Sequence, residues 1–419
     1  MKVLSVLGGR PLYGQVQIHG AKNAVLPILA ATVATKETCV IRGCPDIRDV
    51  DTALEILRYL GCGVDTDGGV IAVNAAGLRR TEIPAGLMEK MRSSVLFLGA
   101  LLAAEGEAVI YPPGGCVLGA RPIDLHISGL RQLGASLLAQ GDRLQFQAAK
   151  LVGGAVVLPY PSVGATENLL LAATAADDSV RIVGAAREPE ISDLAGFLNA
   201  CGADIRGAGT SVVTVYPAAL HGADYRVMPD RMEAATYLSA VACAGGELTL
   251  RQMRPCHLQA VTERYEAAGC SIRSYDDALC VRAGGLHAVT PVITGPYPAF
   301  PTDAQATLMA ALLKADGTTV MEETVFENRY RHVPQLRKLG ADIELAGKIA
   351  RIRGVRSLHG AAMEATDLRG GAAMLTAALG AEGESTLSHI YHMERGYDHM
   401  TQNLCRLGAK IELHGTDER

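Results

Sequence analysis

The stretch "YLGCGV" at residues 59–64 is followed along the chain by five altered copies of itself. The copies are "QLGASL" at 132–137, "ACGADI" at 200–205, "AAGCSI" at 267–272, "KLGADI" at 338–343 and "RLGAKI" at 406–411. Their shared glycines, 61, 134, 202, 269, 340 and 408, stand 67 to 73 residues apart. Each glycine follows apolar residues at helical spacing and precedes a short alternating stretch, which is typical of a helix, its left-handed end and a strand. The spacing therefore predicts six copies of one structural unit.

A second shared element, rich in alanine and leucine, lies upstream of each glycine. The six stretches are "AKNAVLPILAATVA", "MRSSVLFLGALLAA", "GATENLLLAATAA", "DRMEAATYLSAVACA", "TDAQATLMAALLKA" and "TDLRGGAAMLTAALGA". They are apolar on nearly all faces, which predicts buried helices rather than amphipathic surface helices. Strand-like stretches such as "AVIYP" and "GELTL" follow most of them. Strands alternating with helices predict an α/β protein.

Composition excludes several classes of protein. The chain has 419 residues, is 49% hydrophobic and carries a formal net charge of −5, which predicts a large core in two or more domains and argues against nucleic-acid partners. No segment approaches the roughly 18 uninterrupted apolar residues of a membrane span, so we expect no membrane association. The ten cysteines lack CxxC pairs, which favours a reducing cytoplasm. Motifs for metals, dinucleotides and P-loops are missing, so no metal and no cofactor are expected.

Polar residues stand at equivalent places in the six units. The starts of the predicted buried helices carry Lys22 with Asn23, Arg92, Thr166 with Glu167, Asp230 with Arg231, Asp303, and Asp367 with Arg369. The turn before each later helix carries one arginine: Arg48, Arg121, Arg187, Arg254, Arg329 and Arg395. Helix starts attract anions, and guanidinium groups bind phosphate and carboxylate in a bidentate way, so the set predicts an anion-binding cleft. Any single arginine could instead be solvated, with Arg187 and Arg254 as the best examples.

The segment "YPPGGCVLGARPID" at 111–124 enlarges the second unit. From helix start to glycine this unit spans 42 residues, against 36 to 39 in the others. A Gly/Pro-rich loop among anion-binding positions predicts a lid, and Arg121 could lower the pKa of the Cys116 thiol. In contrast Cys39, Cys62, Cys201, Cys243, Cys270 and Cys405 are expected to be small buried hydrophobes.

Nine motifs give the chain a resemblance to a known family. They are "GAKNAVLPIL", "GGCVLGARPIDLH", "PSVGATENLLLAA", "AAREPEISD", "PDRMEAATYL", "PAFPTD", "FENRYRHV", "ATDLRGGAA" and "HMERGYDH", in order from about residue 10 to the C-terminus. The sequence resembles the enolpyruvyl transferases that act on UDP-N-acetylglucosamine (1-carboxyvinyltransferases). The sister family that acts on shikimate phosphate shares the six-unit fold but lacks the cysteine loop.

The resemblance implies an inside-out α/β barrel with two domains, each of three βαβαββ units. One domain would comprise residues 22–229 with the cysteine loop at about 111–121, and the other residues 1–21 plus 230–419. It also implies transfer of enolpyruvyl from phosphoenolpyruvate to the 3-hydroxyl of UDP-N-acetylglucosamine, with release of phosphate. That reaction is the first committed step of peptidoglycan synthesis.

The resemblance also implies site residues. Lys22, Asn23, Arg121 and Arg395 would hold phosphoenolpyruvate, with Arg92 at the phosphate end, and Asn23 would also orient the sugar. Asp303 would be the base for the 3-hydroxyl, and Cys116 the acid that protonates the enol methylene and can form a covalent adduct. Arg48, Arg329, Asp367 and Arg369 would form a supporting network. The sugar nucleotide would contact Arg121, Pro122, Ile123, Asp124, Leu125, Ser162, Val163, Gly164 and Val325, besides Asn23, Arg92 and Asp303.

Two departures and two alternatives remain. Arg48 stands where many relatives have lysine, which keeps the charge but changes its geometry, and Val117 and Leu118 are large for the loop. The same fold could serve an enolpyruvyl transferase with another hydroxyl acceptor, or an inactive paralogue that binds a sugar nucleotide. Retention of Cys116, Asp303, Lys22 and Arg395 together argues against the paralogue.

Overall fold

The computed structural model describes residues 2–114 and 123–415, which form two compact units. Unit N comprises residues 20–114 and 123–228, and unit C comprises residues 2–19 and 229–415. Each unit has its own hydrophobic core. Cys116, Arg121, Pro122, Val117 and Leu118 lie outside the described residues.

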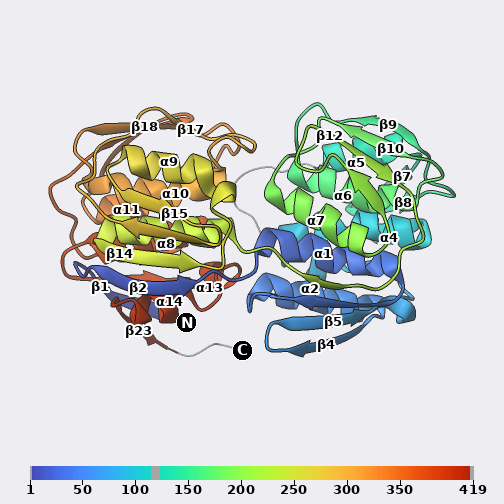
Figure 1. Ribbon diagram of the computed structural model, residues 1–419, viewed down its shortest axis with the longest axis horizontal. Coiled ribbons are helices and arrows are strands. Elements are labelled where there is room, and N and C mark those ends of the chain that lie inside the picture. The colour runs from blue at the N-terminus through green and yellow to red at the C-terminus, as the bar shows by residue number, and fades with distance from the viewer. Residues whose placement is uncertain (1, 115–122, 416–419) are drawn as a thin grey trace. The chain divides into compact units, whose positions relative to one another are not determined.

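Unit N begins with the buried helix α1 (Lys22–Thr35), drawn in blue in Figure 1, and ends with a strand that pairs with its first sheet. Its strands are β3 (Thr38–Arg42), β4 (Gly63–Asp67), β5 (Val70–Asn74), β6 (Glu107–Ile110), β7 (Ser136–Gln140), β8 (Arg143–Gln147), β9 (Gly154–Val157), β10 (Val180–Val183), β11 (Asp204–Arg206), β12 (Val212–Tyr216) and β13 (Asp224–Arg226). Its helices are α1 (Lys22–Thr35), α2 (Arg48–Leu60), α3 (Ala85–Met88), α4 (Phe97–Glu105), α5 (Asp124–Gln132), α6 (Val163–Ala173) and α7 (Pro189–Ala200), with 3₁₀ turns η1 (Ala75–Gly77) and η2 (Arg92–Leu96).

Unit C repeats this plan and recruits the N-terminal strands of the chain. Its strands are β1 (Val3–Leu7), β2 (Leu12–Gln17), β14 (Gly246–Arg251), β15 (Ser271–Ser274), β16 (Ala278–Arg282), β17 (Val292–Ile293), β18 (Thr318–Glu322), β19 (Asp342–Ala346), β20 (Ile349–Arg353), β21 (Ala362–Glu364), β22 (Glu384–Ser388) and β23 (Lys410–His414). Its helices are α8 (Arg231–Ala244), α9 (Gln259–Ala267), α10 (Thr302–Ala311), α11 (Val333–Lys338), α12 (Leu368–Gly380), α13 (Tyr391–Glu394) and α14 (Met400–Arg406), with η3 (Pro255–Leu258), η4 (Leu312–Lys314) and η5 (Arg329–His332).

The strands of the described residues form five four-stranded sheets and one three-stranded sheet. Each four-stranded sheet joins a parallel pair to an antiparallel pair, as in β2 parallel to β14, followed by β16 and β15. The antiparallel pair is a hairpin of consecutive strands in four of these sheets, and in the fifth it is formed by β1 and β23. In the three-stranded sheet β6-β8-β7, no full strand in the described part of the chain pairs in parallel with β6. An isolated parallel bridge between Glu82 and Val109 stands at that place. The repetition confirms the predicted α/β class and the six-unit plan, with the strands in separate open sheets.

The helices after the polar starts form the centre of each unit, as predicted. Helices α1, α4 and α6 contact one another in unit N, and α8, α10 and α12 do so in unit C. Close approach is possible because of glycine: a Cβ at Gly99 of α4 would lie 2.3 Å from the Asn168 carbonyl oxygen of α6. The apolar residues on nearly all faces of these helices are therefore buried.

The six marker glycines all adopt positive φ, between 88° and 107°. This confirms the predicted left-handed helix ends, which a side chain would strain. One boundary differs from the sequence prediction: η2 precedes α4, so the α-helix starts at Phe97 rather than at Arg92. The Ser94 hydroxyl donates to the carbonyls of Met88 and Met91, which holds this first turn to the preceding segment.

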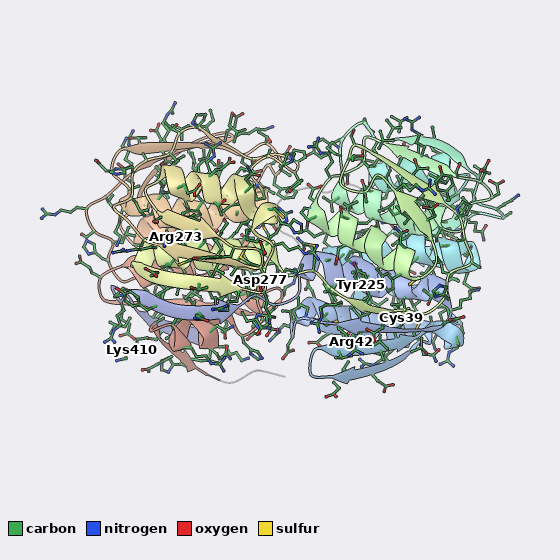
Figure 2. The ribbon with its side chains drawn as sticks, viewed as in Figure 1. Cys39, Arg42, Tyr225, Arg273, Asp277 and Lys410 are labelled. Carbon is green, nitrogen blue, oxygen red and sulfur yellow. The ribbon has the colours of Figure 1, made fainter. Side chains whose placement is uncertain are left out.

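In each unit, a backbone hydrogen bond joins the two segments at which the chain enters and leaves the unit. In unit N the Ala21 N–H donates to the Met228 carbonyl at 2.7 Å, and in unit C the Asp230 N–H donates to the His19 carbonyl at 2.8 Å. Tyr225 of β13, labelled in Figure 2, donates its hydroxyl proton to Asp193 of α7. None of the helices in the described ranges combines the length and apolar character needed to cross a membrane.

The cysteine expectations hold in five of six positions. Cys39, Cys62, Cys201, Cys243 and Cys270 are buried. The prediction is wrong for Cys405, which is exposed near the end of α14. Helix α14 buries only one face, so an apolar residue type does not by itself fix the side on which it lies.

Candidate functional site

In unit C, the first turn of α10 presents a carboxylate to two arginines. Arg329 Nη2 donates to Asp303 Oδ1 at 3.1 Å, while Arg369 Nε and Nη2 donate to Asp303 Oδ2 at 3.2 and 3.0 Å. The side chains of Arg329 and Arg369 are 2% and 4% exposed, whereas that of Asp303 is 30% exposed. Two buried guanidinium groups thus hold a carboxylate that stays partly exposed to solvent.

The arginines have further fixed partners. Arg329 Nε and Nη2 also donate to the Thr302 carbonyl at 3.1 and 2.9 Å, which anchors η5 to the start of α10. The Arg369 side chain projects from α12, whose N-cap is Asp367. Burial opposes ionisation of Asp367, but the charge of Arg329 and the Gly370 N–H outweigh it and lower the pKa of this carboxyl. Asp303, Arg329, Asp367 and Arg369 therefore lie close enough to interact with one another, while their roles stay a prediction.

The two other predicted residues of unit C lie beside these four residues. Val325 is held by Glu323, whose Oε1 accepts from the Val325 N–H at 2.8 Å and whose Oε2 accepts from the Thr302 hydroxyl at 2.9 Å. Arg395 follows α13 and is half-buried. Burial is the largest cause that lowers the pKa of His392; Arg395 lowers it further, and Asp367 opposes this shift. The predicted residues of unit C therefore gather at the starts of its inner helices.

In unit N, Lys22 opens α1 and forms a buried ion pair. Its Nζ lies 2.8 Å from Asp49 Oδ2, and the two side chains are 10% and 4% exposed. Asn23, the next residue, is exposed, and so is Arg48, the first residue of α2. The starts of α1 and α2 therefore meet through a charged pair. The sequence predicts site roles for Lys22, Asn23 and Arg48, whereas the part of Asp49 emerges only from the structure, although its place in the first turn of a predicted helix is visible in the sequence.

The remaining predicted residues of unit N belong to three neighbouring segments. Arg92 starts η2, Ile123, Asp124 and Leu125 lead into α5, and Ser162 caps α6 before Val163 and Gly164. Burial, followed by the charge of Arg92, lowers the pKa of His126 to about 4, while Asp124 opposes the shift. A Cβ built at Gly164 would lie 3.1 Å from His126 Cε1. His126 therefore lies where these three segments meet, a position for which the sequence alone predicts no role.

Asn168 fixes the protonation of His126. The Asn168 Oδ1 accepts from the Gly99 N–H at 2.6 Å, so its Nδ2 must donate, and it reaches the Val95 carbonyl at 3.1 Å and His126 Nδ1 at 2.8 Å. Since Nδ1 accepts, the neutral imidazole carries its proton on Nε2. Unit N thus offers an imidazole N–H donor between Arg92 and the start of α6.

Comparison with known proteins identifies the family. The chain matches the family of EPSP synthase (3-phosphoshikimate 1-carboxyvinyltransferase) over residues 6–412. It is 46% identical to "UDP-N-acetylglucosamine 1-carboxyvinyltransferase" of Gluconacetobacter diazotrophicus, with 97% of each chain covered. It is 43% identical to "UDP-N-acetylglucosamine 1-carboxyvinyltransferase 2" of Caldanaerobacter subterraneus, with 98% of this chain and 99% of the relative covered.

Solved structures agree with the family match. The enolpyruvyl transferase NikO from Streptomyces tendae superposes with a TM-score of 0.89 at 25% identity, and 98% of each chain is covered. EPSP synthase from Acinetobacter baumannii gives a TM-score of 0.74 at 20% identity, covering 99% of this chain and 100% of that one, and shares the fold. The chain therefore belongs to the enolpyruvyl transferase family, among the UDP-N-acetylglucosamine 1-carboxyvinyltransferases.

Proposed function

We propose that this protein transfers the enolpyruvyl group of phosphoenolpyruvate to the 3-hydroxyl of UDP-N-acetylglucosamine and releases phosphate, as the first committed step of peptidoglycan synthesis. The observation that carries the proposal is the sequence identity of 43% to 46% between this chain and relatives named UDP-N-acetylglucosamine 1-carboxyvinyltransferase, which extends over nearly the whole chain. The arginine-bound carboxylate of unit C and the lysine and arginine helix starts of unit N supply the charges that such substrates need.

The addition step needs a base and an acid. Asp303 accepts the proton of the 3-hydroxyl while the sugar oxygen forms a bond to C2 of phosphoenolpyruvate. Cys116 delivers a proton to C3, so the enol carbon–carbon double bond becomes single and a tetrahedral adduct forms. The exposure of Asp303 to solvent supports its role as the base, because a substrate could reach this carboxylate while the buried Arg329 and Arg369 hold it in place.

In the elimination step the Cys116 thiolate takes a proton from C3, and the proton held by Asp303 is available to the departing phosphate. The bond between C2 and the phosphate oxygen breaks, C3 loses a proton, and the double bond of the enolpyruvyl ether forms. Lys22, Arg92, Arg121 and Arg395 are proposed to hold the phosphate and carboxylate throughout, because positive groups that need no reorganisation stabilise the charge that develops. The Cys116 thiol can alternatively add across the double bond, its sulfur to C2 and its proton to C3, and hold the phospholactoyl group covalently.

The sugar nucleotide is proposed to bind along the starts of α5 and α6. Residues 121–125 and 162–164 would contact the uridine diphosphate, Val325 the sugar, and Asn23 would orient the acceptor. The start of α6, which Ser162 caps, supports this placement, because the N-terminus of a helix favours a bound anion. We place the protein in the cytoplasm, where reducing conditions keep thiols free, and the nine described cysteines are free thiols.

Phosphate release tests the proposed function directly. Purified protein mixed with phosphoenolpyruvate and UDP-N-acetylglucosamine should release one phosphate for each sugar nucleotide consumed, and mass spectrometry should find the enolpyruvyl ether. Omitting either substrate is the control. Release that requires a different hydroxyl acceptor would overturn the assignment of substrate while keeping the enolpyruvyl transfer.

Covalent labelling tests the role of Cys116. An epoxide that mimics phosphoenolpyruvate should add once, at Cys116, because that thiol is proposed to lie beside the arginines. Cys116→Ala should lose the label, and Cys116→Asp should lose it while keeping an acid at the position. Exposed Cys256 and Cys405 provide an internal control, since labelling there would show reactivity without a site.

A further inference from the structure

Tyr397 links three parts of unit C and has no role in the reaction described so far. It is 5% exposed and lies two residues after Arg395, where its backbone N–H donates to the Met393 carbonyl at 3.0 Å. The Tyr397 hydroxyl and the Thr236 hydroxyl are 2.9 Å apart. Because Thr236 donates its own proton to the Met232 carbonyl, Tyr397 is the donor of this bond, and its oxygen keeps its lone pairs.

The ring of Tyr397 supports the arginine that holds the proposed base. Arg369 Cζ lies 5.2 Å from the centroid of the ring. Two nitrogens of Arg369 donate to Asp303, and Nη1 is buried with no hydrogen-bond acceptor at normal geometry among the described residues. Burial opposes the charge of this guanidinium, but the Tyr397 side chain, its next polar neighbour, helps to raise the pKa of Arg369. Hydrogen bonds therefore fix one edge of the guanidinium, and the aromatic face of Tyr397 limits its remaining rotation through a cation–π contact.

The segment that carries Arg395 is pressed against the same helix. A Cβ built at Gly371 of α12 would lie 2.7 Å from the Met393 Cγ, so α13 packs directly on the first turns of α12. Burial raises the pKa of Tyr397, while the charge of Arg369 opposes the shift. The phenol therefore stays neutral and keeps its bond to Thr236.

We propose that Tyr397 is a positioning residue for enolpyruvyl transfer, which holds Arg369 against Asp303 and ties that pair to the loop bearing Arg395. Its hydroxyl fastens the ring to α8, its face rests on Arg369 of α12, and its backbone closes the turn that follows α13. The inference rests on the proposed function, because Asp303 and Arg395 are the groups proposed to act on the substrates. Tyr397 itself transfers no proton.

The chain contains a matched control for this hydroxyl. Tyr265 is also buried, and its hydroxyl lies 2.6 Å from Ser239 Oγ, whose proton goes to the Ala235 carbonyl at 2.7 Å. Each tyrosine thus forms a hydrogen bond with a hydroxyl on α8, and these two hydroxyls belong to Thr236 and Ser239, three residues apart. Tyr265 has no described contact with Arg369 or Asp303, so Tyr397→Phe and Tyr265→Phe remove the same chemistry from different surroundings.

Steady-state kinetics and thermal unfolding separate positioning from stability. We expect both variants to lower Tm by similar amounts. Tyr397→Phe should lower kcat about tenfold, because a small displacement of the base and its arginine is costly. The KM for UDP-N-acetylglucosamine should stay within about twofold, and the acid limb of the kcat–pH profile should move to higher pH, since a looser Arg369 stabilises the ionised base less. Tyr265→Phe should leave kcat and this limb unchanged.

Equal losses of kcat in the two variants, or an unchanged acid limb in Tyr397→Phe, would overturn the inference. If Tyr397→Phe does not fold, Thr236→Val removes the same bond from its other side and should give the same shift of the limb, while Thr236→Ser should restore it. A wild-type protein that releases no phosphate with UDP-N-acetylglucosamine refutes the proposed substrate instead. In that case the variants are compared with the hydroxyl substrate to which the wild-type protein does transfer the enolpyruvyl group.

Discussion

Replacing Asp303 by asparagine is expected to lower kcat by roughly 10²- to 10⁴-fold, the range in which a general base contributes. An amide of the same size cannot accept the proton of the 3-hydroxyl. Its NH₂ group would also face a guanidinium nitrogen, where the carboxylate now accepts from Arg329 and Arg369. We therefore expect a second effect, a loss of stability of roughly 1.5–3 kcal/mol, because charged hydrogen bonds are lost.

Asp342→Asn provides the control for this prediction. Asp342 also pairs with an arginine, Arg353, but both side chains are about half exposed, at 49% and 53%. Surface pairs contribute only about 0–1 kcal/mol, so this variant should keep both its activity and its Tm. Phosphate release under saturating substrates measures kcat, and urea unfolding measures stability. Retention of more than about a tenth of the activity by Asp303→Asn would show that another group acts as the base.

Replacing Lys22 by glutamine is expected to affect both binding and stability. Loss of one charge-assisted contact to phosphoenolpyruvate, worth roughly 1.5–3 kcal/mol, should lower kcat/KM for this substrate roughly 10- to 150-fold. The same change leaves the buried carboxylate of Asp49 without its lysine. Removing one partner of a buried ion pair costs about 3–5 kcal/mol, so the variant should unfold at much lower urea concentration.

A double variant separates the two effects of Lys22. Lys22→Gln combined with Asp49→Asn replaces the ion pair by a neutral amide pair, which removes the uncompensated charge. We expect most of the stability to return while kcat/KM for phosphoenolpyruvate stays low. Lys90→Gln, which breaks the exposed pair with Glu55, is the control and should change neither quantity. Recovery of activity in the double variant would show that Lys22 acts through Asp49 and not on the substrate.

The charged residues of the site could be named from sequence because the motifs carry them, but their partners could not. Asp303 and Arg369 are 66 positions apart, and the Tyr397 and Thr236 hydroxyls 161. No local pattern links residues so distant. His126 illustrates the same limit, because its low pKa comes from burial and from Arg92, which only folding brings near. Cys405 is a second example: its residue type predicts burial, but it is exposed, because exposure depends on which parts of the chain cover α14.

By itself the sequence determined the repeated α/β plan, the buried inner helices and the left-handed glycine that ends each later helix. These features are local, because apolar spacing and the steric freedom of glycine act within a few residues. The tertiary structure alone decided which charges are paired: Lys22 with Asp49, and Asp303 between Arg329 and Arg369. The reason is physical, since a buried charge persists only where packing brings a compensating group to it, and that group can come from any part of the chain.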